Sequence, residues 1–226
     1  MAEDVYVETG ANRVFANAIR WPGWSRAGRD ELSALQALAD YGARYGRAVR
    51  TARLGFRAPV DSHSFLIVER VSGNATTDFG APAVPPSMDE AEMDVGELRR
   101  SEAILKACWR TFDEAVEAAA GRRLSKGPRG GGRELKAIVE HVLGAEAAYL
   151  GRLGWPFKLD SKAAPQAELG RIREDILRGL ASAAQGEIVP QGPRGGRRWT
   201  PRYFVRRSAW HVLDHAWEIE DRIKVS

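Results

Sequence analysis

The segment RRSAWHVLDHAWEIEDR, at residues 206–222, decides how the C-terminal half of this chain folds. Apolar side chains recur in it at the three- and four-residue spacing of a helix that buries one face. Just upstream, Thr200 and Pro201 form a favourable N-cap and first helical residue. The pattern therefore predicts a helix over residues 201–223.

Three further segments of this half show the same helical period. They span residues 95–120, 133–152 and 164–185. Four amphipathic segments of comparable length, joined by loops, are typical of a four-helix bundle.

The N-terminal part instead alternates apolar and polar residues, which is the period of β-strands. The expected elements are a hairpin of residues 4–8 and 13–21, a loop over 22–28, a helix over 29–50, a strand over 64–71 and a short strand from residue 76. A stretch rich in Pro, Gly and then acidic residues, at 80–94, is typical of a linker. The sequence thus predicts an α+β chain with a small α+β domain at 1–80, a linker at 81–94 and an all-α bundle at 95–226.

Composition narrows the function classes. The 226 residues carry a net charge of +4, and contain no apolar run long enough to span a bilayer. The start of the chain lacks the pattern of a secretory signal, so we expect a cytoplasmic protein without a membrane partner. The single cysteine, Cys108, lies in a helical apolar context and is interpreted as a packing residue. Basic and aromatic residues are not interleaved as in nucleic-acid-binding surfaces, so nucleic acid is not an expected partner.

The sequence GPRGG occurs twice, at residues 127–131 and 192–196, each time ahead of a predicted helix. Neither copy follows a strand or continues into the Lys and Ser/Thr of a phosphate-binding loop. The sequences around the copies do not match, so they do not indicate a duplication. We interpret them as basic loops between helices, which would attract an anionic substrate if they border a site.

Three histidines form the candidate metal centre. His211 and His215 are four residues apart, so they share one face of the fourth predicted helix. His141 lies inside the second and can supply a third nitrogen if the two helices pack together. Three imidazoles with open coordination positions suit a catalytic zinc, nickel or iron ion. The alternative is that His211 and His215, which lie off the centre of the apolar face, are two solvated surface residues.

Side chains near these histidines are weaker candidates. Glu218 can orient His215, pair with Arg222 or act as a base. Arg207 shares the histidine face and can bind a substrate carboxylate or remain solvated. Ser208 can hydrogen-bond a ligand or a backbone carbonyl. His63 is expected in a loop of the N-terminal domain, outside the centre. Small residues around His141 leave room for a ligand or serve close helix packing; they are Ala137, Gly144, Ala145 and Ala148.

The C-terminal part resembles the DinB superfamily of metal-binding four-helix bundles, which includes YfiT-like proteins. The likeness rests on KAIVEHVLGAEAAYLGRLG at 136–154 and on residues 206–222, where His141, His211 and His215 match the family's metal ligands. The resemblance implies a divalent metal, often zinc or nickel. It also implies transfer, isomerisation or hydrolysis of a small substrate, in some members with a low-molecular-weight thiol.

The N-terminal part loosely resembles the HicB-type antitoxin fold, through residues 5–41 and the PGWSRAGRDELSAL segment at 22–35. That resemblance implies binding of a partner or of a second copy, as in a homodimer. Two functions therefore stand side by side. One is a metal-dependent transferase or hydrolase with a small, anionic substrate. The other is a non-enzymatic, partner-binding or regulatory protein whose bundle is a scaffold.

Overall fold

The computed structural model describes residues 2–126, 132–193 and 195–223, and it has the mixed α+β architecture that the sequence predicts. A four-stranded sheet lies in the N-terminal part. Its strands are β1 (Glu3–Thr9), β2 (Val14–Ala18), β3 (Ser25–Gly28) and β4 (Phe65–Ser72). They are ordered β3-β2-β1-β4, with β1 antiparallel to β2 and parallel to β4. β4 is therefore an edge strand.

The helices fall into a short and a long group. The short ones are α1 (Glu31–Asp40), α2 (Gly42–Ala48) and α3 (Ala75–Phe79), with 3-10 turns at Arg50–Ala52, Ser62–Ser64 and Ser87–Glu90. The long ones are α4 (Val95–Ala119), α5 (Leu135–Leu153), α6 (Pro165–Ala184) and α7 (Pro201–Arg222). The four long helices match the four predicted segments to within a few residues. None of the helices described is long and apolar enough to cross a membrane.

Three local expectations in the N-terminal part were wrong. The expected loop at 22–28 contains β3, because the backbone of Ser25–Gly28 pairs with β2. The expected helix at 29–50 ends at Asp40 and restarts at Gly42, since glycine weakens helical continuity. The expected strand from residue 76 is instead helix α3. Its N-cap Asn74 and Thr77 form a capping box, which outweighs the strand preference of threonine.

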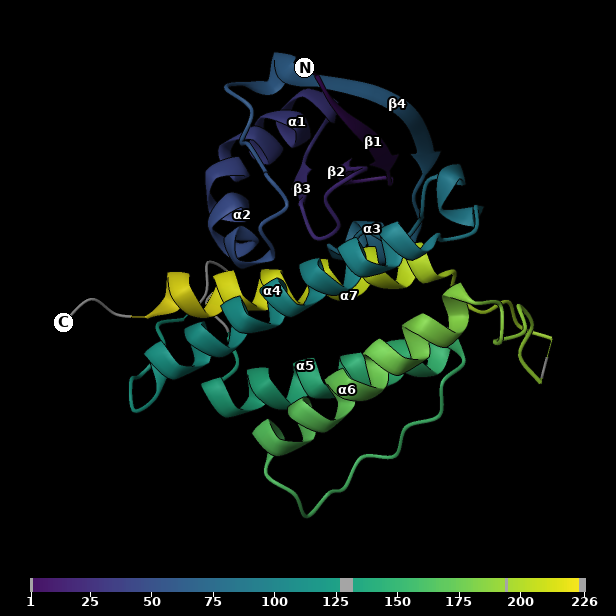
Figure 1. Cartoon of the computed structure of the whole chain (residues 1–226). Coiled ribbons are helices and arrows are strands. Elements are labelled where there is room, and N and C mark those ends of the chain that lie inside the picture. Colours follow the sequence, from purple (N-terminus) through teal and green to yellow (C-terminus); the bar gives the residue numbers. More distant parts are fainter. Residues whose placement is uncertain (1, 127–131, 194, 224–226) are drawn as a thin grey trace.

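The relative directions of the long helices follow from contacts at their ends. Arg202 and Glu97 form a 2.6 Å ion pair at the starts of α7 and α4, so these helices run the same way. Arg222, at the end of α7, donates 2.8 Å to the carbonyl of Arg133, just before α5. α5 therefore runs antiparallel to α7, and α6 packs beside α5 (Figure 1).

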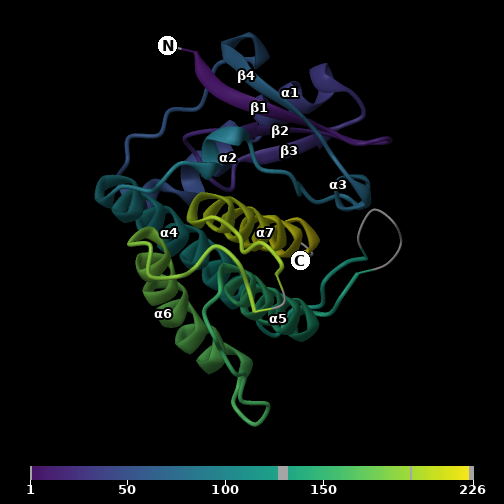
Figure 2. The same cartoon turned by 90° about the vertical axis from the view of Figure 1, so that its right-hand side faces the viewer.

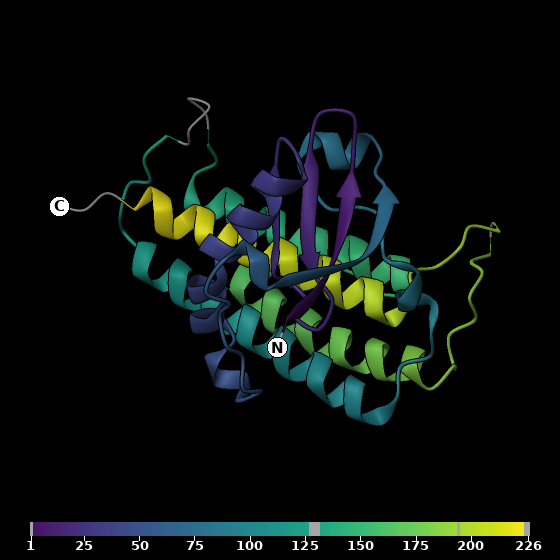
Figure 3. The same ribbon diagram turned by 90° about the horizontal axis from the view of Figure 1, so that it is seen from above.

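Helices α4 and α7 form the middle layer of the molecule. The sheet with α1 and α2 covers one side, and α5 and α6 cover the other (Figure 2). Viewed from the sheet side, the strands cross over α7 (Figure 3). Phe15 of β2 meets Trp210 edge-on at 6.3 Å, and Tyr41 meets Trp217 at 5.3 Å. α7 is thus buried on both sides, and a single-face amphipathic pattern understates its burial.

The segment between sheet and bundle is held by a buried ion pair. Asp89 is fully buried, and its Oδ2 lies 2.8 Å from Nε of Arg206 on α7. Arg206 also donates to the carbonyls of Ala18 and Ile19, at 2.9 and 2.8 Å. One guanidinium therefore joins α7, the segment before α4 and the end of β2.

The first GPRGG copy, at 127–131, and Arg194 of the second copy lie outside the described residues. Residues that flank the two copies are described, and they lie at opposite ends of the α5–α7 pair. Arg133 contacts Arg222 at the end of α7, whereas the backbone N–H of Trp199, just before α7, donates 3.0 Å to Arg152 near the end of α5.

Candidate metal centre

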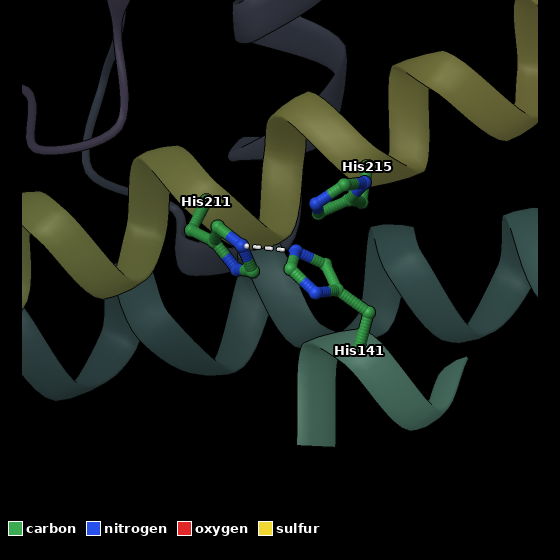
Figure 4. A group of neighbouring side chains, drawn as sticks. All are labelled: His141, His211 and His215. Carbon is green, nitrogen blue, oxygen red and sulfur yellow. Dashed lines mark hydrogen bonds between the residues drawn. The ribbon is translucent and has the colours of Figure 1, made fainter. Parts of the chain in front are cut away.

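The three predicted histidines converge between α5 and α7 (Figure 4). Nε2 of His211 lies 3.2 Å from Nε2 of His141, and the ring of His215 completes the group. Each residue offers a ligand nitrogen, and all three nitrogens lie within 4.8 Å of one another. The i,i+4 spacing places His211 and His215 on one face, and the antiparallel packing of α5 brings His141 against it.

The centre is on the inner side of the bundle rather than on its surface. The exposed fraction of His211 is 6%, while His141 and His215 are half-buried. The alternative of two solvated histidines is therefore wrong for His211. Gly144, about one turn after His141 on α5, is exposed, and a Cβ added there would meet no neighbouring atom within 4 Å. Glycine at this position does not serve close packing of the helices.

Burial keeps two of the imidazoles neutral. Desolvation, with the like charge of His215, lowers the pKa of His211 well below its ordinary value. The same two causes, in the same order, lower the pKa of His141. A neutral imidazole offers a nitrogen lone pair, which is the form that a metal ion binds. His141 and His211 can therefore each offer a nitrogen lone pair to a cation at neutral pH.

A carboxylate and a guanidinium support the third histidine. Nδ1 of His215 donates to Oε2 of Glu218 at 2.8 Å, because an ionised carboxylate only accepts. Oε1 of Glu218 accepts from Nη1 of Arg222 at 2.6 Å. The hydrogen bond from His215 is the largest cause that lowers the pKa of Glu218. Glu218 thus both orients His215 and pairs with Arg222, as two of its three expected roles require. Because both of its oxygens are engaged, this geometry argues against the third role, that of a base.

The two substrate-binding candidates lie one turn before His211. The Arg207 guanidinium lies 4.7 Å from the ring centroid of Trp210 and 5.4 Å from that of Tyr149. Ser208 is buried, with an exposed fraction of 1%. Within the described part of the chain, Nη1 of Arg207, Oγ of Ser208 and Nδ1 of His211 are buried without a hydrogen-bond partner. Buried polar atoms of this kind are normally satisfied by water or a ligand.

Tyr149 is a neighbour that the sequence reasoning missed. Its ring meets that of His211 edge-on at 5.6 Å, and it contacts Trp199 at 5.1 Å. The available signal was its position about two helical turns after His141, which places both on neighbouring faces of α5. Tyr149 and Arg207 border the histidine group on the side that faces the start of α7.

The other singled-out residues lie away from the centre. His63 is exposed in the 3-10 turn Ser62–Ser64 and does not belong to the histidine group. Cys108 is fully buried on α4, and burial raises the pKa of its thiol, in agreement with a packing role.

Comparisons of this chain with protein-family models, with curated proteins and with solved structures find no match. The case for the site therefore rests on its geometry.

Proposed function

We propose that this chain is a metal-dependent transferase or hydrolase that acts on a small, anionic substrate. His141, His211 and His215 would hold zinc or nickel, and the helical half would be a DinB-like bundle. The observation that carries the proposal is the convergence of three ligand nitrogens, from helices far apart in sequence, within 4.8 Å of one another.

The donor set fits such an ion. Tetrahedral zinc with Zn–N bonds of about 2.0–2.1 Å holds its nitrogens about 3.3–3.4 Å apart. The Nε2 atoms of His141 and His211 already lie 3.2 Å apart. Three imidazole ligands suit zinc or nickel, and three protein ligands leave a coordination position for substrate.

The residues around the centre have distinct tasks in this proposal. Glu218 would fix the ring of His215 so that Nε2 remains free for the metal. Arg207, which contacts two aromatic rings and whose Nη1 has no partner among the described residues, would bind a substrate carboxylate. A bound dication would lower the pKa of a coordinated water or thiol. It would thereby provide a nucleophile at neutral pH.

Cobalt substitution tests the open coordination position without knowledge of the substrate. Cobalt(II)-loaded protein should develop a thiolate-to-metal charge-transfer band when a low-molecular-weight thiol such as cysteine is added. The His211→Ala variant should show no such band. Cobalt that binds but accepts no added thiol would indicate a closed, structural site and would contradict a thiol-dependent reaction.

One observation favours the partner-binding alternative. Edge strand β4 exposes Leu66 and Val68, with exposed fractions of 54% and 48%. Unpaired strand edges with apolar side chains are sites of pairing between chains. Light scattering tests this: a dimer that becomes a monomer in Leu66→Lys would support the alternative, and a monomeric wild type would count against homodimerisation.

A further inference from the structure

A cavity lies at the junction of the sheet and the bundle, and no residue of the histidine group lines it. Its volume is about 300 Å³. It is lined by the chain after β2, the segment that precedes α4, and the first halves of α4 and α7. Such a volume is at the lower end of the range for small-molecule sites.

The inner wall of this cavity is apolar. Ile104 of α4 and Val205 of α7 are each 1% exposed, and Met93 is 7% exposed. Met88, also part of the lining, is 42% exposed. The wall therefore suits the hydrocarbon part of a ligand, with a methionine where the cavity meets solvent.

Four guanidinium groups line the same cavity, and two of them are neutralised. Arg206 pairs with Asp89 at 2.8 Å, and Arg202 pairs with Glu97 at 2.6 Å. Arg20 and Arg100 differ from these, because neither forms an ion pair with any carboxylate of the described residues. The cavity consequently carries an excess of positive charge.

The position of Arg100 is fixed by groups that carry no charge. Its Nη2 donates 2.9 Å to the carbonyl of Arg20, and its guanidinium lies 4.2 Å from the Trp21 ring centroid. Burial and the like charge of Arg20 lower the pKa of Arg100. Glu3 is a carboxylate whose charge acts on Arg100, but it forms no ion pair with Arg20 or Arg100, and burial raises its pKa. An added anion would relieve this imbalance.

We propose that the cavity binds a small amphipathic carboxylate. The carboxylate would lie between Arg20 and Arg100, and the hydrocarbon chain would lie along Ile104 and Val205. Arginine is the side chain best matched to a carboxylate, because it can donate two parallel hydrogen bonds. A medium-chain fatty acid combines this head group with a body that the apolar wall accepts.

Such a ligand would join the sheet layer to the middle layer of α4 and α7. Arg20 belongs to the connection between β2 and β3, and Arg100 belongs to α4. Binding to the folded chain only would raise its stability by mass action. The melting temperature is therefore a second readout beside the binding heat.

Calorimetric titration of the full chain, as purified, with octanoate tests the proposal. We expect saturable binding of one octanoate per chain and a rise in Tm. Arg100→Gln should weaken binding about tenfold or more, which is the usual value of a charge-assisted hydrogen bond. Arg99→Gln is the matched control, because this neighbouring arginine is exposed and does not line the cavity. His211→Ala should bind octanoate like the wild type, which separates this site from the metal centre.

Three results would overturn the proposal. The first is the absence of saturable heat at millimolar octanoate. The second is equal affinity in Arg100→Gln and Arg99→Gln. The third is equal affinity for octanoate and octylammonium, which would show that binding does not depend on the negative charge of the ligand. If Arg100→Gln does not fold by circular dichroism, the exposed Arg20→Gln replaces it with the same expected loss.

Discussion

Glu218 accepts a hydrogen bond from Nδ1 of His215 at 2.8 Å and is itself held by Arg222 at 2.6 Å. This chain of contacts selects the tautomer of His215 that leaves Nε2 without a proton. Arg222 is fixed in turn by the carbonyls of Ser125 and Arg133. The loop after α4 and the start of α5 therefore support one imidazole of the candidate centre.

We expect Glu218→Ala to weaken zinc affinity about 10- to 100-fold, because the histidine loses the partner that orients it. Competition with a chromophoric chelator measures this change. Asp214→Asn is the matched control: Asp214 precedes His215 directly, but it pairs with Arg26 at 3.2 Å, away from the centre. Equal affinities of the two variants would remove Glu218 from the metal site.

The buried pair of Asp89 and Arg206 should dominate the attachment of the segment before α4. Asp89→Ala leaves a buried guanidinium without its counter-ion, which costs about 3–5 kcal/mol of the free energy of unfolding. Urea unfolding provides the measurement. Glu31→Ala is the control, because the pair of Glu31 with Arg70 is exposed and should contribute less than about 1 kcal/mol. A small effect of Asp89→Ala would show that the pair is solvated in solution.

Glu146 should make stability depend on pH. It is buried on α5, its Oε1 accepts 2.7 Å from Nε1 of Trp109, and burial raises its pKa to about 7. Between its ordinary value of 4.5 and about 7, the folded chain keeps a proton that the unfolded chain releases. This contribution to stability is therefore fully present below about pH 4.5. It declines as the pH rises from there and is lost once the pH has passed through about 7.

Glu146→Gln isolates this contribution, because it removes the titration and keeps the shape. From about pH 5 to about pH 8, the wild type should lose about 2–3 kcal/mol relative to the variant. Urea unfolding across this range measures the difference. Arg173, whose Nε lies 3.8 Å from Oε2 of Glu146, also pairs with Asp113 at 2.8 Å, so the variant should not leave it without a counter-ion. A pH-independent difference would show that Glu146 is ionised throughout.

The four long helices and the shared face of His211 and His215 were predictable, because both depend on spacing within one segment. The meeting of His141 with this pair was a conditional expectation. It depends on the antiparallel direction of α5 and α7, which is decided by tertiary contacts such as Arg222 with Arg133. Local periodicity does not encode such contacts.

The burial of α7 was underestimated for a related reason. Trp210 and Trp217 point away from the bundle centre and are covered by Phe15 and Tyr41 of the N-terminal part. A helical wheel treats one face as solvent and has no information on a second layer. The short strand β3 was missed because its four residues gain their structure from pairing with β2 rather than from their own preference.

The central claim is that the three histidines hold one metal ion, and elemental analysis tests it most directly. The protein should be purified without a histidine tag, as wild type, as His211→Ala and as the exposed-histidine control His63→Ala. We predict close to one zinc or nickel ion per chain in the wild type and in His63→Ala, and its loss in His211→Ala. A wild type that takes up neither metal when both are offered, or a His211→Ala variant that retains its metal, would contradict the account.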